Sequence, residues 1–150
     1  CKLYNVLFIV NDDVNLANAV DADGVHLGEL DDKLDKARAK MPGKIIGVSC
    51  YNQLERAVAA EERGADYVAF GSFFPSATKP DAKHAPIELL RQAWQHVSIP
   101  IVAIGGVTVN NAAELIEAGA DAVAVVRAVF EAEDIMYAAK NFSKLFENQT

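Results

Sequence analysis

The sequence predicts a single α/β domain over residues 1–150, of the parallel (β/α)8 TIM-barrel type with about six of the eight βα units present. Short apolar runs rich in Val and Ile recur at intervals of about 20 residues with one longer gap, and helical patterns fill the intervals. The short, even spacing favours a barrel over an open doubly wound sheet. Because a full barrel usually takes ~200 residues or more, we expect two further units outside this chain.

Six apolar runs are predicted as parallel strands. Their apolar character is nearly continuous, as expected for strands that are buried on both faces beneath covering helices. In chain order the runs are Val6–Val10, Gly24–Leu27, Ile45–Val48, Tyr67–Phe70, Ile101–Ile104 and Ala122–Val126.

Helical signals stand between these runs. Asn52 precedes an apolar stripe and is followed three residues later by Glu55, which predicts a helix capped by Asn52. A second helix is predicted from Thr108 to a stop at Gly119. Residues 135–146 space their apolar side chains at helical period, which predicts a helix that docks on the domain rather than a free tail.

An Ala-Asp pair recurs where a helix gives way to a strand. The three copies are Ala22-Asp23, Ala65-Asp66 and Ala120-Asp121, each followed by the first residues of a predicted strand. The repeat therefore marks the turn from helix to strand, and no Pro- or Gly-rich linker interrupts the series.

Charge and cysteine content narrow the classes of function. The chain has 14 Lys and Arg against 21 Asp and Glu, and its net charge of −7 would repel nucleic acids and anionic membranes. We expect neither as a partner, and a phosphorylated small molecule would need a few local donors. Cys1 and Cys50 are too few for a disulfide framework, so we expect a reducing, cytoplasmic location. No apolar stretch approaches the ~20 residues that span a membrane.

The residues directly after the apolar runs are the candidates for function, because the active sites of such barrels lie at the carboxyl ends of the strands. Most of these residues are polar or Gly: Asn11-Asp12, Gly28 to Asp31, Ser49, Gly71 leading into residues 74–80, Gly105-Gly106 and Arg127. At Gly105-Gly106 a phosphate could approach bare backbone N–H groups, although such a pair can also simply permit a tight turn.

Two acids follow neighbouring strands, Asp12 at the end of one and Asp31 in the loop after the next. Carboxylates combined with substrate phosphates are the usual ligands of Mg²⁺. The alternative is that Asp31 caps the helix that follows it, as Asp13 could cap the helix after the first strand. Spacing alone leaves both interpretations open.

Several other side chains have a structural and a functional interpretation. His26 lies inside an apolar run and is either a satisfied buried histidine or a group close to a substrate. Lys79 is either a solvated surface lysine or the cation that holds a diphosphate. His84 and His96 are expected at the surface, and Trp94 is expected to pack between helices.

Five stretches together resemble one family, the thiamine-phosphate synthases, and the resemblance covers essentially the whole chain. The stretches are Phe8-Ile9-Val10-Asn11-Asp12, Ala22-Asp23-Gly24-Val25-His26-Leu27-Gly28, Ile46-Gly47-Val48-Ser49, Phe74-Pro75-Ser76-Ala77-Thr78-Lys79-Pro80 and Val102-Ala103-Ile104-Gly105-Gly106-Val107. The resemblance implies that residues 1–150 correspond to units three to eight of the family barrel. It also implies Mg²⁺-dependent coupling of hydroxymethylpyrimidine diphosphate to hydroxyethylthiazole phosphate, in which diphosphate leaves before the new bond forms.

The resemblance also implies a set of site residues. Asp12 and Asp31 would bind Mg²⁺. The pyrimidine diphosphate would be held by Asn11, Ser49 and Lys79, of which Ser49 and Lys79 would be catalytic. The thiazole phosphate would be surrounded by Ser76, Thr78, Gly106, Val126 and Arg127.

The chain departs from the family pattern at Glu29, where Gln is more usual, at Arg127, where Ser is frequent, and in lacking a counterpart of the first two units. The alternatives are a thiazole tautomerase-like relative, another phosphate-binding barrel such as an epimerase or a tryptophan-pathway enzyme, and an inactive truncated phosphate-binding barrel. Six units would leave two sheet edges unpaired, and unpaired edges recruit other chains, so we expect self-association.

Overall fold

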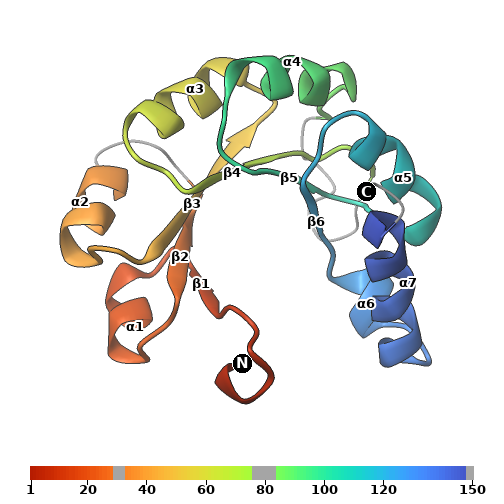
Figure 1. The fold of residues 1–150 in the computed structure, drawn as a ribbon, viewed down its shortest axis with the longest axis horizontal. Coiled ribbons are helices and arrows are strands. Elements are labelled where there is room, and N and C mark those ends of the chain that lie inside the picture. The colour runs from red at the N-terminus through yellow and green to blue at the C-terminus, as the bar shows by residue number, and fades with distance from the viewer. Residues whose placement is uncertain (29–32, 76–83, 148–150) are drawn as a thin grey trace.

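The computed structural model describes residues 1–28, 33–75 and 84–147, and it shows a curved parallel sheet with helices along its outer side (Figure 1). The strands are β1 (Ile9–Asn11), β2 (Gly24–Leu27), β3 (Ile45–Tyr51), β4 (Tyr67–Phe70), β5 (Ile101–Ile104) and β6 (Ala122–Ala124). The helices are η1 (Lys2–Tyr4), α1 (Val14–Ala19), α2 (Lys33–Lys40), α3 (Leu54–Glu62), α4 (Glu88–His96), α5 (Val109–Glu117), α6 (Arg127–Phe130) and α7 (Ile135–Glu147).

The six strands pair in chain order, β1-β2-β3-β4-β5-β6, and every pairing is parallel. This arrangement of six βα units confirms the predicted fold class. The sheet curls like part of a barrel wall, and its two edge strands, β1 and β6, are not paired with each other. No helix within the described residues has the length and apolar character needed to cross a membrane.

The predicted strand limits hold for three of the four inner strands and fail at both edges of the sheet. β2, β4 and β5 have the predicted bounds, whereas β3 continues to Tyr51 through a register shift after Ser49. The first strand was predicted over Val6–Val10 but begins at Ile9, because pairing with β2 starts there and the three residues before it are exposed. β6 ends before Val126, which occupies the N-cap position of α6 without a side-chain capping bond.

The three Ala-Asp pairs have a shared structural role at the amino ends of alternate strands. The carboxylates of Asp23, Asp66 and Asp121 accept the backbone N–H groups of Phe8, Ile46 and Ile101, each within one residue of the start of a neighbouring strand, at 2.7 Å in all three cases. Each of these aspartates also donates its own backbone N–H to the carbonyl of that same strand residue. The reciprocal pair of bonds joins each helix-to-strand turn to the neighbouring strand, which confirms the predicted turn position.

Two predicted helix ends are confirmed and one is wrong. α5 begins after Thr108, whose side chain forms a capping box with Asn111, and it ends just before Gly119. The N-cap of α3 is Gln53, not Asn52, and Gln53 makes no side-chain capping bond, because β3 extends further than predicted. α7 docks on α5 and α6 through buried Phe142, as predicted.

The exposure of two histidines agrees with prediction, and that of Trp94 does not. His84 and His96 are exposed, as expected. Trp94 was expected to be packed between helices, but its side chain is 67% exposed. It lies on the outer surface of α4, where its Cβ comes within 3.1 Å of the position that a Cβ on Gly119 would take.

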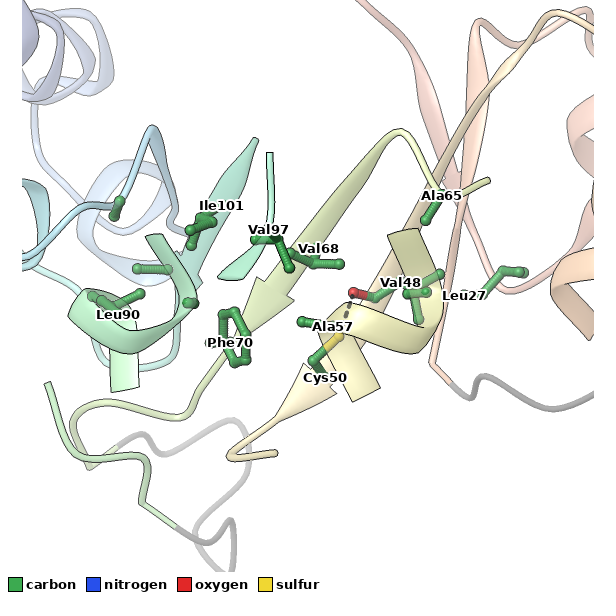
Figure 2. Close-up of a cluster of buried hydrophobic side chains, with 14 of the residues drawn as sticks. Leu27, Val48, Cys50, Ala57, Ala65, Val68, Phe70, Leu90, Val97 and Ile101 are labelled. Carbon is green, nitrogen blue, oxygen red and sulfur yellow. Dashed lines mark hydrogen bonds between the residues drawn. The ribbon is translucent and has the colours of Figure 1, made fainter. Parts of the chain in front are cut away.

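The core lies between the sheet and the helices. Figure 2 shows Val48 and Cys50 of β3 gathered with Val68 and Phe70 of β4 and with Ala57 of α3. Burial raises the pKa of the Cys50 thiol to about 12, so this cysteine is an inert core residue.

Side chains that alternate with these core residues point to the other face of the sheet. Val102 and Ile104 of β5 are half-buried there, whereas Ile101 and Ala103 are buried beneath the helices. The prediction that the strands are buried on both faces is therefore wrong for the inner face, because the curved sheet does not close around it. The half-buried face carries the candidate site.

Candidate functional site

The inner face of the sheet forms a cavity of about 1390 Å³ that extends from the end of β1 to α6. Its polar lining residues include Asn11, Asp12, His26, Ser49, Tyr51, Tyr67, Ser72, Thr108, Arg127 and Glu131. Most of them stand at or just beyond the carboxyl ends of strands, where barrel active sites lie.

Asp12 is held at one end of the cavity by hydrogen bonds to both of its carboxylate oxygens. The side-chain amide of Asn11 donates to Oδ2 at 2.7 Å, and the backbone N–H of Gly28 donates to Oδ1 at 2.8 Å. The backbone of Asp12 has a φ of 60°, a left-handed conformation that is uncommon outside Gly and that clusters at functional sites. These contacts orient the carboxylate, and they leave lone pairs on both oxygens for a ligand.

The neighbouring acid has a different role. The Asp13 side chain accepts the backbone N–H of Leu16 at 2.9 Å and thereby caps α1. This confirms that capping belongs to Asp13 and not to Asp12. Asp31, the second predicted metal ligand, lies outside the described residues, and within those residues no group of three or more His, Cys, Asp or Glu is placed to hold a metal ion.

His26 joins two hydroxyl groups on the floor of the cavity. Its Nδ1 lies 2.9 Å from the Tyr67 hydroxyl oxygen, and its Nε2 lies 2.9 Å from the Ser49 hydroxyl oxygen. The His26 and Tyr67 rings stack with centroids 5.5 Å apart. Burial lowers the pKa of His26, and the Asp12 charge opposes that shift. The structural interpretation of His26 is confirmed, because both ring nitrogens have partners; the ring also lines the cavity, and its closeness to a substrate stays a prediction.

A hydrogen bond from Tyr51 joins the end of β3 to the end of β2. Its hydroxyl donates to the Gly28 carbonyl at 2.7 Å, and the guanidinium carbon of Arg56 lies 5.3 Å from the centre of its ring, within cation–π range. Gly28 is thus held on both sides, since its N–H is bonded to Asp12. The contact fixes the carboxyl end of β2.

Gly105 and Gly106 form the other end of the cavity. Both have positive φ values, 91° and 65°, and a Cβ on Gly106 would lie 2.6 Å from the Pro75 carbonyl oxygen and 2.7 Å from that of Phe74. The Asn111 side chain donates to the Gly106 carbonyl at 3.1 Å. The site therefore requires glycine here, and it brings bare backbone to the cavity wall.

Arg127 and Glu131 line the same cavity as this glycine pair. The Arg127 Nε donates to both carboxylate oxygens of Glu131, at 2.8 and 2.9 Å, and the interaction raises the pKa of Arg127 and lowers that of Glu131. Val126, one residue earlier, is 65% exposed and also lines the cavity.

The structure brings six of the sequence-predicted site residues to one cavity: Asn11, Asp12, Ser49, Gly106, Val126 and Arg127. The other four, Asp31, Ser76, Thr78 and Lys79, lie outside the described residues. Sequence reasoning missed Tyr51, Tyr67 and Glu131. Strand alternation could have placed Tyr67 on the face of Ser49, since both lie an odd number of residues from core positions of their strands.

Comparisons with known proteins agree on one family. The profile of the family described as "Thiamine monophosphate synthase" matches residues 1–129. A thiamine-phosphate synthase of Nitrosospira multiformis is 55% identical over 100% of this chain and 64% of its own length. One from Nitrosomonas eutropha is 54% identical over 97% of this chain and 69% of its own length. The solved thiamine phosphate pyrophosphorylase of Pyrococcus furiosus is 44% identical, with a TM-score of 0.88 over 97% of this chain and 70% of its own.

Proposed function

The chain belongs to the thiamine monophosphate synthase family, and on that basis we propose that it couples hydroxymethylpyrimidine diphosphate with hydroxyethylthiazole phosphate. In this reaction the bond from the pyrimidine methylene carbon to the diphosphate oxygen breaks, and its electron pair leaves with diphosphate. The thiazole ring nitrogen then forms the new C–N bond, which gives thiamine phosphate. The observation that supports this most is the high identity over the whole chain to relatives named for this activity.

The chain spans 64% of the length of the Nitrosospira relative and 69% of that of the Nitrosomonas relative. We propose that its six βα units correspond to units three to eight of the family barrel. The parallel order of the six strands supports this register, and so does the location of Gly105-Gly106 and Arg127 after the last two strands, where such barrels frequently bind phosphate.

We propose that Asp12 and Asp31 hold a Mg²⁺ ion together with oxygens of the diphosphate. The Asp12 carboxylate suits this role, since it faces the cavity and is oriented by two hydrogen bonds of the kind that position metal ligands. When bound, the ion would supply positive charge to the departing diphosphate. Asn11 would act by fixing the carboxylate.

The two substrates would lie at opposite ends of the cavity. Ser49, Asn11 and Lys79 are proposed to hold the pyrimidine diphosphate near Asp12. Ser49 would donate a hydrogen bond, and Lys79 would supply a cation as the diphosphate departs. The backbone at Gly106 and Val126 would bind the thiazole phosphate, with the side chains of Arg127, Ser76 and Thr78 around it. The reaction needs a stabilised leaving group and exclusion of water, and it needs no protein nucleophile.

Substitution of Asp12 tests the metal proposal, and the adjacent acid provides a matched control. Asp12→Asn removes a metal ligand, whereas Asp13→Asn removes an equal charge from a helix cap that Asn fills nearly as well. We expect Asp12→Asn to lower kcat by ~10²-fold or more and to raise the Mg²⁺ concentration at half-maximal rate, by analogy with loss of one transition-state stabiliser. Asp13→Asn should change neither.

The assay measures thiamine phosphate formation by this chain alone and by the chain joined to the amino-terminal segment of the Nitrosospira relative. Equal rates for the Asp12→Asn and Asp13→Asn variants, with unchanged Mg²⁺ dependence, would contradict the metal assignment. Absence of product from both wild-type proteins, when both fold, would contradict the proposed reaction itself.

A further inference from the structure

The contact of His26 with Tyr67 is possible because the residue between them on β3 is a glycine. His26 of β2 pairs with Gly47 of β3, and Gly47 pairs with Tyr67 of β4, so the three residues form one row across the sheet. Neighbours in such a row point to the same face. A Cβ on Gly47 would lie only 1.9 Å from the Tyr67 ring. The absence of a side chain at Gly47 lets the two rings meet above it.

Ser49 lies two residues beyond Gly47 on the same strand, and therefore on the same face. The three groups form a chain of two contacts, from the Tyr67 hydroxyl through both ring nitrogens of His26 to the Ser49 hydroxyl. Within the described residues neither hydroxyl has a second hydrogen-bond partner. The direction of the two hydrogen bonds to His26 therefore decides whether the Ser49 or the Tyr67 hydroxyl has a hydrogen left to donate.

A neutral imidazole has one donor nitrogen and one acceptor nitrogen, so only two arrangements are available. In the first, the Tyr67 hydroxyl donates to Nδ1, and Nε2–H donates to the Ser49 oxygen. In the second, the Ser49 hydroxyl donates to Nε2, and Nδ1–H donates to the Tyr67 oxygen. At pH 8 an ordinary imidazole and an ordinary phenol are both mainly neutral, so these two arrangements are the ones to compare.

The first arrangement is favoured by the relative donor strengths of the two hydroxyl groups. A phenol, with a pKa of about 10, is a stronger hydrogen-bond donor and a weaker acceptor than an aliphatic hydroxyl. In the second arrangement, the unpaired hydrogen would be that of Tyr67, a weaker use of the better donor. In the first arrangement, the unpaired hydrogen is that of Ser49, which faces the cavity.

We propose that Tyr67 is a positioning residue that, through His26, presents the Ser49 hydroxyl to the cavity as a hydrogen-bond donor. The ligand of Ser49 is then a hydrogen-bond acceptor, an oxygen or ring nitrogen of the pyrimidine diphosphate. The identity of that ligand rests on the proposed function, whereas the direction of the hydrogen bonds does not.

Nitrogen-15 NMR of the histidine rings tests the direction without any activity measurement. The chain has three histidines, and His96 supplies an internal reference of the opposite tautomer, because its Nδ1 lies 2.7 Å from the Gln92 carbonyl, which can only accept. At pH 8 we expect two-bond couplings that report Nε2–H for His26. Tyr67→Phe, which retains the ring but removes the donor, should convert His26 to a mixture of tautomers. An Nδ1–H ring in the wild type, or no change in Tyr67→Phe, would overturn the proposal.

A double-mutant cycle tests the positioning role. We expect Tyr67→Phe to lower kcat about 10-fold in the presence of Ser49, the effect of a hydrogen bond of ordinary strength, and less than about twofold in a Ser49→Ala background. Gly47→Ala should reproduce the loss by displacing the Tyr67 ring while retaining its hydroxyl. Equal losses in both backgrounds would overturn the positioning role. If the wild type forms no thiamine phosphate, the proposed function fails and the NMR result alone decides the hydrogen-bond direction.

Discussion

Replacement of Gly106 by Ala probes the cavity end assigned to the thiazole phosphate. Gly106 has a φ of 65°, and its new Cβ would lie 2.6 and 2.7 Å from the carbonyl oxygens of Pro75 and Phe74. Gly43 provides the control, because it has a similar φ of 76° but nothing within 4 Å of its added Cβ. The pair of variants therefore separates the cost of the backbone conformation from the cost of the close approach.

The expected magnitudes follow from these two terms. A left-handed backbone costs a non-glycine residue about 1–2 kcal/mol, and this cost applies to both variants. Gly106→Ala must in addition shift two carbonyl groups, and overpacking of this kind typically costs about 1–3 kcal/mol. We therefore expect Gly43→Ala to lower the free energy of unfolding by about 1–2 kcal/mol, and Gly106→Ala to lower it by about 2–5 kcal/mol.

Urea unfolding gives the stabilities, and calorimetric titration with hydroxyethylthiazole phosphate gives the affinities. Movement of the backbone at Gly106 should weaken phosphate binding, whereas Gly43→Ala should leave it unchanged, since Gly43 lies in the turn before β3 and is not part of the cavity. Equal unfolding free energies and equal affinities for the two variants would refute the close approach at Gly106 and its assignment to phosphate binding.

Three further predictions concern single side chains. Asp121→Ala removes the acceptor of a strand N–H and should lower the free energy of unfolding by about 1.5–3 kcal/mol in urea titrations. Hydrogen bonds from Lys2 and Lys44 lower the pKa of Asp21 to about 2, so its contribution to stability is present above pH ~4 and lost as pH falls towards 2. Carboxyl NMR titration should find that midpoint, and Lys44→Gln should raise it. Arg127→Ser should weaken thiazole-phosphate binding about 10- to 100-fold in calorimetry.

Sequence reasoning located the central strands because their signal is local. β2, β4 and β5 are short, mostly apolar runs with a neighbour on each side, and their predicted and observed bounds agree. β1 lies at the sheet edge, so the apolar residues 6–8 before it have no second strand to pack against and are exposed. Apolar content predicts burial in the middle of a sheet, but at an edge the actual pairing register sets where a strand begins.

The site residues that lie at the carboxyl ends of strands could be predicted from the sequence. Asn11, Asp12, Ser49 and Gly106 come directly after or within the ends of apolar runs, and the structure places them on one cavity. Tyr67 was missed because it begins its strand, at the end far from where barrel sites are sought. Its approach to His26 depends on the pairing register across β3 and on the absence of a side chain at Gly47. Neither can be read from the sequence near Tyr67.

Acidic residues have different roles at the two ends of the sheet. At the amino ends, Asp23, Asp66 and Asp121 each use a carboxylate oxygen to accept a backbone N–H of the neighbouring strand, so these acids help to hold the strands together. At the carboxyl ends, Asp12 and Tyr51 adopt left-handed backbone conformations, and such strain persists only where the surrounding structure over-determines it. Both residues are bonded to Gly28, Asp12 to its N–H and Tyr51 to its carbonyl. The satisfied amino ends supply the rigid scaffold, and the Gly28 contacts hold an acid with free lone pairs at the cavity, as a metal ligand requires.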